Sequence, residues 1–236
     1  MEPVRGVIFD LFHTLTARES EWSELPSTCE LLGIDRVDWD RVLLESSRWR
    51  LVGEVRDPRE IVERLARHLI PGIEEERLAK VLEMRTRRFA DILARIPATS
   101  TRTLDSLRRA GMKLALLSNA DALEIGAYAD SCLARRFDVE VFSCDVGCAK
   151  PEPEIYALCL ERLGLAPHEC IFVGDGGSDE LRGAKAAGLR TVFMSGAIEE
   201  LWPERVAARR ALADHHIRSI PEVLGWLGVD ASEELA

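Results

Sequence analysis

The chain has 236 residues, of which 31% are charged and 47% hydrophobic, and its formal net charge is −10. This composition is typical of a folded, enzyme-sized protein and excludes a chain that is disordered throughout. The acidic balance argues against a nucleic-acid partner, because affinity for the phosphate backbone requires clustered Lys and Arg. The sequence shows no secretory signal pattern and no apolar run that could span a bilayer, so we expect a cytoplasmic protein without a membrane partner.

The first predicted element is a short buried strand over residues 4–9, which is apolar and ends at the polar stretch DLFHTLT. From about residue 21 to residue 96, apolar side chains recur three and four positions apart between charged ones. This spacing predicts a series of amphipathic helices without a strand.

After residue 97 the pattern changes to strands in alternation with helices. A helix is expected from about residue 122, and strands are expected at 112–119, 139–144, 170–175, 190–194 and 215–220. Such alternation specifies βαβ units with right-handed crossovers and a parallel sheet. We therefore predict an α/β fold in which residues 1–16 and 97–236 form a doubly wound, Rossmann-like core and residues 17–96 form an inserted helical unit.

Polar side chains follow three of the predicted strands directly. Asp10 follows the first strand, Ser118 and Asn119 end the second, and Asp175 follows the strand CIFVG. Lys150 lies in the loop CAKPEPEIY. In an open parallel sheet the ligand site lies at the carboxyl ends of the strands, so we expect these five residues to converge.

Four short stretches, in this order, carry a family resemblance: FDLFHTL, LLSNAD, AKPEPEIY and FVGDGGSDELRGAKAAG. Together, with a helical insertion between the first and the second, they resemble the motifs of the haloacid dehalogenase (HAD) superfamily of hydrolases. The resemblance implies a hydrolase with a Rossmann-like core. It also implies that the insertion is a helical cap, which closes over the site and selects the substrate.

The resemblance assigns catalytic roles to matching positions. Asp10 resembles the nucleophile that forms a covalent aspartyl intermediate. Ser118, with Asn119 beside it, resembles the residue whose hydroxyl binds the transferred group, and Lys150 resembles the ammonium that neutralises charge. His13 is a candidate for proton transfer.

The resemblance also implies a Mg²⁺ site. Its ligands would be Asp10, the backbone carbonyl of Phe12, Asp175 and one further acid. Both Asp179 and Glu180 fit the spacings that the family uses for that acid, so the two remain alternatives. Carboxylate oxygens are hard ligands suited to Mg²⁺, in agreement with this assignment.

Phe12 departs from the pattern of the family's phosphatases, which have a second aspartate at this position. That aspartate protonates the leaving alkoxide and then deprotonates the hydrolytic water, and a phenyl ring can do neither. General acid catalysis commonly contributes about 10²- to 10⁴-fold, so the loss matters most for poor leaving groups. An aromatic residue here resembles the members that cleave carbon–halogen bonds, whereas Gly174-Asp175 resembles the metal-dependent branch.

We therefore favour a Mg²⁺-dependent phosphatase that acts on a small phosphorylated metabolite through an aspartyl-phosphate intermediate. The alternatives are a metal-independent hydrolase similar to 2-haloacid dehalogenases and a non-catalytic binding protein with the HAD fold. The resemblance to the dehalogenases also implies an arginine in the first cap helices that binds the substrate, and Arg41, Arg48 and Arg50 are candidates for binding its carboxylate or phosphate. The sequence does not decide whether the protein is a homodimer, because the tryptophans of the helical tract could form either the core of the tract or a dimer face.

Overall fold

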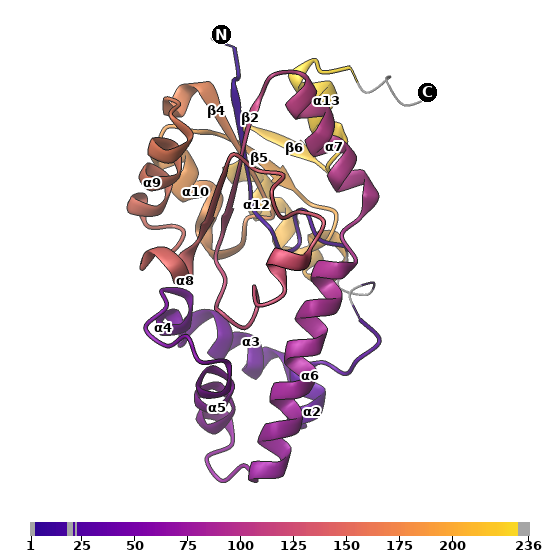
Figure 1. Cartoon of the computed structure of the whole chain (residues 1–236), viewed down its shortest axis with the longest axis vertical. Coiled ribbons are helices and arrows are strands. Elements are labelled where there is room, and N and C mark those ends of the chain that lie inside the picture. Colours follow the sequence, from indigo (N-terminus) through magenta and orange to yellow (C-terminus); the bar gives the residue numbers. More distant parts are fainter. Residues whose placement is uncertain (1–2, 18–20, 22, 231–236) are drawn as a thin grey trace.

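The structure is a computed structural model that describes residues 3–17, 21 and 23–230, and its centre is one parallel sheet (Figure 1). The strands are β1 (Gly6–Phe9), β2 (Lys113–Ser118), β3 (Val139–Phe142), β4 (Cys170–Gly174), β5 (Arg190–Met194) and β6 (His215–Ile217). Their order in the sheet is β3-β2-β1-β4-β5-β6, and every neighbouring pair is parallel. The predicted doubly wound α/β fold is confirmed. The chain winds outward in both directions from the boundary between β1 and β4, which is where such sheets bind ligands.

Helices cover both faces of this sheet. They are α7 (Ala98–Arg109), α8 (Ser143–Val146), α9 (Pro153–Leu163), α10 (Glu180–Ala186), α11 (Ile198–Leu201), α12 (Val206–Leu212) and α13 (Glu222–Leu227). Successive strand residues point to opposite faces, so Val7 packs in one apolar cluster with α7 and α13 while Ile8 packs in the other with α9 and α10. Both faces are buried, which explains the nearly continuous apolar strands.

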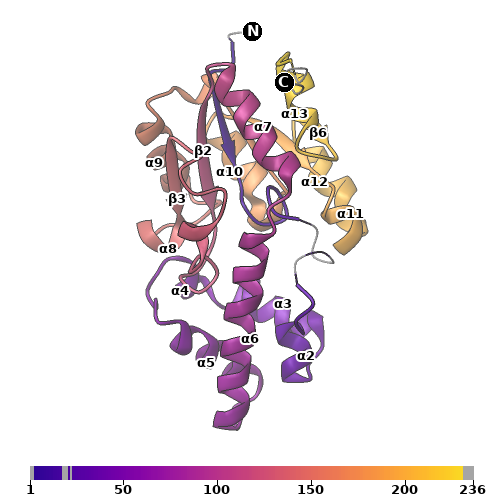
Figure 2. The ribbon, with the colours of Figure 1, turned by 45° about the vertical axis from the view of Figure 1, so that its right-hand side comes forward.

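The segment between β1 and β2 is helical, as predicted. It contains α2 (Thr28–Leu32), α3 (Arg36–Glu45), α4 (Arg48–Leu51), α5 (Pro58–Leu69) and α6 (Glu75–Ala94). Figures 1 and 2 show these helices as a group at one end of the molecule, below the sheet, with α6 leading back to α7. We call this group the cap. Among the described residues, no helix has both the length and the apolar character that crossing a bilayer requires.

The cap has an apolar cluster of its own. Ile61, Leu65 and Leu78 are almost fully buried in it, and Trp39 and Trp49 pack there as well. These two tryptophans therefore contribute to the interior of the cap. Residues 18–20 and Trp22 lie outside the described residues, and the predicted boundaries at residues 16 and 96 stay predictions.

The predicted helix from about residue 122 is wrong. Turns occupy this segment, and a short 3₁₀ helix spans Tyr128–Asp130. The segment starts as a helix would, because Asp121 Oδ1 accepts the Glu124 N–H at 2.9 Å and Glu124 Oε2 accepts the Asp121 N–H at 3.0 Å. The same carboxylates bind arginines of the cap, and Gly126 weakens the helical alternative further.

Candidate active site

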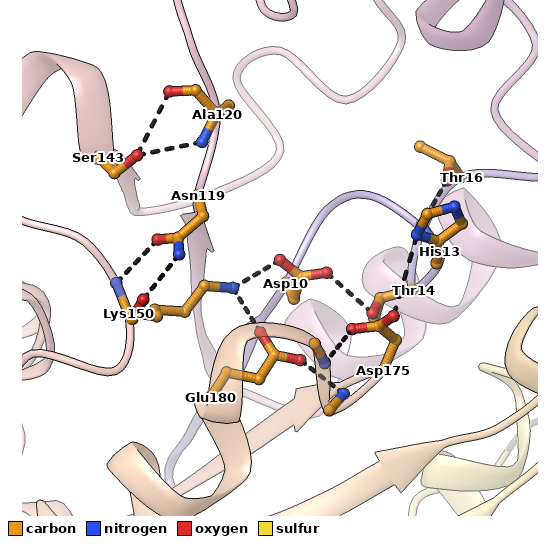
Figure 3. A network of polar contacts seen from close by, with 12 residues as sticks. Asp10, His13, Thr14, Thr16, Asn119, Ala120, Ser143, Lys150, Asp175 and Glu180 are labelled. Atoms are coloured by element: carbon orange, nitrogen blue, oxygen red, sulfur yellow. Dashed lines mark hydrogen bonds and ion pairs between the residues drawn. The ribbon is translucent and has the colours of Figure 1, made fainter. Parts of the chain in front are cut away.

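Asp10 lies where the sheet changes direction. It directly follows β1, and its backbone N–H donates to the carbonyl of Val173 in β4 at 2.9 Å. The residue is 6% exposed. The carboxylate is therefore held at the carboxyl edge of the sheet, between the ends of β1 and β4 (Figure 3).

Lys150 joins two carboxylates from opposite sides of the site. Its Nζ donates to Asp10 Oδ1 and to Glu180 Oε2, both at 2.6 Å. The lysine backbone is fixed by Asn119, whose Nδ2 donates to the Lys150 carbonyl and whose Oδ1 accepts the Lys150 N–H, both at 2.8 Å. Asp10, Asn119 and Lys150, three of the five residues predicted to converge, therefore meet, and the contacts of Asn119 position the lysine (Figure 3).

The loop after β4 brings in two more carboxylates. Asp175 Oδ1 accepts the Gly177 N–H at 2.7 Å, and Glu180 Oε1 accepts the Gly176 N–H at 2.9 Å. Glu180 passes so close to Gly174 that a Cβ at position 174 would lie 2.2 Å from Glu180 Oε1. Glycine at 174 is therefore required for the approach of the glutamate.

Three of the predicted metal ligands meet. Asp10, Asp175 and Glu180 are buried, and each offers an oxygen within 4.8 Å of the others. The structure does not bring Asp179 to this cluster, since its side chain is 65% exposed and pairs with Arg182 at 3.8 Å. Of the two alternatives, Glu180 has the geometry of a ligand. Three buried carboxylates within reach of one another offer the oxygen ligands that a small divalent cation prefers, so the residues fit Mg²⁺.

Burial has the largest effect on the pKa values of the two carboxyl groups that contact Lys150. It raises the pKa of Asp10, and it raises the pKa of Glu180 to about 8, against the opposing effect of Lys150. Burial alone would lower the pKa of Lys150, but the Asp10 and Glu180 carboxylates raise it above its ordinary value. The lysine is therefore charged, and Asp10 and Glu180 share its one positive charge.

Two hydroxyl groups follow β1 or end β2, the strand beside it. Ser118 is fully buried at the end of β2, and its Oγ has no hydrogen-bond partner among the described residues. A buried hydroxyl without a partner costs about 1–3 kcal/mol, and an arriving acceptor would remove that cost. Thr14 donates from Oγ1 to Asp10 Oδ2 at 3.0 Å. Thr14 stands in the FDLFHTL motif but was not among the residues predicted for the site.

Phe12 and His13 lie beside the carboxylates, on the loop that faces the cap. The Phe12 ring packs edge to face on Phe89 of α6, with centroids 5.6 Å apart. His13 has a φ of 61°, and its Nδ1 lies 3.9 Å from Asp175 Oδ2. Its ring also packs against Trp202 at 5.6 Å. The proton-transfer role of His13 stays a prediction.

A cavity of about 640 Å³ lies between the cap and the core. Its walls include aromatic side chains from both, among them Phe12, Trp39, Phe89 and Trp202. Asn119 also lines the cavity, so it reaches the loop that carries Ser118. The size suits a small metabolite, and the aromatic lining favours one with an apolar part.

The three candidate arginines of the cap are all paired. Arg41 and Arg48 form exposed ion pairs with Asp38 and Glu152. The residue Arg50 is 3% exposed. It donates from Nη1 to Asp121 Oδ2 at 2.8 Å and to Glu124 Oε1 at 3.0 Å, so these core carboxylates neutralise it.

Arg85 of α6 completes this buried ion cluster, since its Nη2 donates to Glu124 Oε1 at 2.9 Å. Asp121 and Glu124 lie just beyond Ser118 on the same loop. The cluster of Arg50, Arg85, Asp121 and Glu124 therefore ties α4 and α6 of the cap to the loop that bears the site hydroxyl. The sequence does not predict this cluster, because nothing local distinguishes these charges from a solvated helix face.

Comparison with known proteins shows the family of this chain. The fold and its convergent carboxylates and lysine define a hydrolase with a Rossmann-like core and a helical cap. The model of the haloacid dehalogenase-like hydrolase family matches residues 4–188, so the chain belongs to this family of enzymes.

One curated relative is the phosphoserine phosphatase of Thermus thermophilus, which is 35% identical over 102 residues. That match spans 43% of this chain and only 41% of the length of the relative. Among solved structures, the L-2-haloacid dehalogenase of Xanthobacter autotrophicus has a TM-score of 0.66 at 21% identity, with 95% of this chain and 98% of that chain covered. A magnesium-bound HAD-hydrolase of Bacillus subtilis has a TM-score of 0.70 at 19% identity, with 97% and 100% covered. At these identities the structures support the fold alone.

Proposed function

We propose that this protein is a Mg²⁺-dependent phosphatase that hydrolyses a small phosphorylated metabolite through an aspartyl-phosphate at Asp10. The observation that carries the proposal is the buried cluster of Asp10, Asp175 and Glu180 within 4.8 Å, with Lys150 between two of its members. Carboxylates this close together repel one another, and a divalent cation bound between them would relieve that repulsion. The named phosphatase among the relatives supports the same reaction class.

The chain's own groups cover most of the chemistry. A carboxylate oxygen of Asp10 attacks phosphorus, a new O–P bond forms, and the bond from phosphorus to the leaving oxygen breaks. The ammonium of Lys150 reduces repulsion between Asp10 and the anionic substrate. Ser118 Oγ, which has no hydrogen-bond partner in the described part of the chain, donates to a phosphoryl oxygen. Mg²⁺ held by Asp10, Asp175 and Glu180 would supply further positive charge against the phosphoryl oxygens.

Phe12 limits the leaving group. A leaving alkoxide needs a proton, and the phenyl ring has none to give. The proposal therefore favours substrates whose leaving group is stable as an anion, such as acyl phosphates and aryl phosphates. Hydrolysis of the aspartyl-phosphate should also be slow, because position 12 has no carboxylate to deprotonate the attacking water.

A metal-independent hydrolase of a 2-haloacid is the second candidate. Phe12 favours it, because a halide leaves without a proton and the ring lines the cavity between cap and core. The Xanthobacter structure has chloropropionic acid covalently bound, which illustrates the reaction in a protein of the same fold. A binding protein without turnover is the third candidate, but it leaves the retained Asp10–Lys150–Glu180 arrangement without a use.

Phosphate release from acetyl phosphate and p-nitrophenyl phosphate tests the proposal. The assay compares wild type with Asp10→Asn, each with Mg²⁺ and with EDTA. Turnover that requires both Asp10 and Mg²⁺ is the expected result. Halide release from 2-chloropropionate in the presence of EDTA, without phosphate release from either ester, would instead establish the second candidate.

A further inference from the structure

Arg209 contacts one of the metal-site carboxylates from outside the four sequence motifs. It lies on α12, and its Nη1 donates to the Asp175 carbonyl at 2.8 Å and to Asp175 Oδ2 at 3.2 Å. Its side chain is 12% exposed. No sequence motif or family match concerns this residue, because α12 lies beyond residue 188, where the family model ends.

Contacts on two sides hold the side chain of Arg209 in place. Its aliphatic stem runs against Gly176, where φ is +80° and a Cβ would lie 3.0 Å from Arg209 Cδ. Its guanidinium lies over the ring of Trp202, 5.8 Å from the centroid. Glycine on one side and indole on the other hold the guanidinium on Asp175.

A charge count shows what this contact does. Lys150 is shared by Asp10 and Glu180, whereas Asp175 pairs with Arg209. Three carboxylates thus face two cations that belong to the chain. A divalent cation at Asp175 would be repelled by the guanidinium and would compete with it for the same carboxylate.

We propose that Arg209 is a metal-tuning residue: it serves as the built-in counter-ion of Asp175, holds that carboxylate in place without metal, and weakens the site's affinity for a divalent cation. The inference rests on the proposed metal site and adds a residue that sets its affinity. Arg209 acts through Asp175 and is therefore a positioning residue.

Calorimetric titration of Mg²⁺ and of Mn²⁺ into metal-free protein tests the proposal. The variants are Arg209→Gln, which removes the charge, and Arg209→Lys, which keeps it. Arg205→Gln is the matched control, because Arg205 lies over the same Trp202 ring at 5.5 Å and its side chain is 49% exposed. If Arg209→Gln does not fold, as judged by circular dichroism, Arg209→Met takes its place.

The expected result is tighter binding of both ions to Arg209→Gln, by about tenfold or more, since the nearest fixed positive charge on Asp175 is gone. Arg209→Lys and Arg205→Gln should stay within about threefold of wild type. The metal-free Arg209→Gln protein should also melt at a lower temperature than metal-free wild type, and Mg²⁺ should raise its melting temperature more.

Unchanged or weaker binding to Arg209→Gln overturns the inference, and so does equal tightening in Arg209→Gln and Arg209→Lys. In both cases wild-type binding of Mg²⁺ leaves the proposed function standing. If neither wild type nor any Arg209 variant binds Mg²⁺ or Mn²⁺, the inference and the metal half of the proposed function both fail.

Discussion

Lys150 and Asp10 are 140 positions apart in the sequence, and Lys150 Nζ lies 2.6 Å from Asp10 Oδ1. Their ion pair is buried and also includes Glu180. A buried charge that loses its partner is costly, because neither water nor another ion compensates it. We therefore expect loss of this ion pair to lower both the stability of the protein and its catalytic activity.

Replacement of Lys150 by Met should destabilise the metal-free protein by about 3–5 kcal/mol, because Asp10 and Glu180 then lose their shared cation. Turnover should fall by about 10²-fold or more, the size of effect seen when a transition-state donor is removed. Urea denaturation and phosphate release measure the two effects. The double variant Asp10→Asn, Lys150→Met should be more stable than Lys150→Met alone; if it is less stable, the two groups do not interact as described.

Replacement of Glu180 by Gln should weaken Mg²⁺ binding by about tenfold or more, since a buried carboxylate ligand is lost. Asp179→Asn is the matched control. The two residues are adjacent, yet the Asp179 side chain points to solvent, so its removal should change the affinity less than about twofold. Equal losses in the two variants, measured by calorimetry, would show that the structure misassigns the ligand.

An aspartate at position 12 should restore a proton donor for poor leaving groups. With Phe12→Asp, kcat/KM for an alkyl phosphate should rise relative to kcat/KM for p-nitrophenyl phosphate by about tenfold or more. Phe12→Leu removes the contact with Phe89 without adding an acid, and it should leave this ratio unchanged. A ratio that rises equally in both variants would mean that the gain comes from space and not from acid catalysis.

The buried ion pairs between cap and core should contribute more to stability than the exposed ones. Arg50→Met leaves Asp121 without its guanidinium and should cost about 3–5 kcal/mol of unfolding free energy. Arg48→Met, two positions earlier on α4, removes an exposed pair with Glu152 and should cost less than about 1 kcal/mol. Similar midpoints for the two variants in urea would contradict the burial that we describe.

His216 predicts a pH dependence of stability. Burial, and then the charge of Arg210, lowers the pKa of His216 below its ordinary value of 6.5, and its Nε2 lies 2.8 Å from Ser195 Oγ. The unfolded chain therefore binds a proton more readily than the folded chain does. The stabilisation is fully present above about pH 6.5 and is lost as the pH falls through the lower pKa of the folded state.

Melting temperatures of wild type and His216→Gln between pH 8 and pH 5 measure this effect. The difference between the two proteins should shrink as the pH falls. A difference that is constant, or that grows toward pH 5, would contradict the lowered pKa.

The sequence was sufficient for the strands and for the residues that end them. Asp10, Ser118 and Asp175 follow apolar runs, and parallel strands bring their carboxyl ends to one edge. The sequence could not decide whether Asp179 or Glu180 is the third metal ligand, because the motif spacing allowed both. The structure decides it locally: Asp179 adopts a φ of 53° just before α10, whereas Glu180 opens the helix and turns inward.

The contacts that the sequence did not predict join distant segments. Arg209 reaches Asp175 across 34 positions, and Arg50 reaches Asp121 across 71. In sequence each arginine belongs to an ordinary charged helix. The pairing of Arg50 also bears on the wrong helix after residue 122, because this arginine of the cap binds both carboxylates at the start of that segment.

The most direct test of the central claim is to look for the phosphoryl group on Asp10. Wild type and Asp10→Asn are mixed with acetyl phosphate, with Mg²⁺ or EDTA, quenched in acid within one turnover, and digested for mass spectrometry. We predict one phosphoryl group on the peptide that contains Asp10, only in wild type with Mg²⁺, and in high yield because Phe12 cannot activate the water for the second step. Phosphate release that continues in Asp10→Asn, or Mg²⁺-dependent turnover in wild type that leaves this peptide unmodified, would contradict the account.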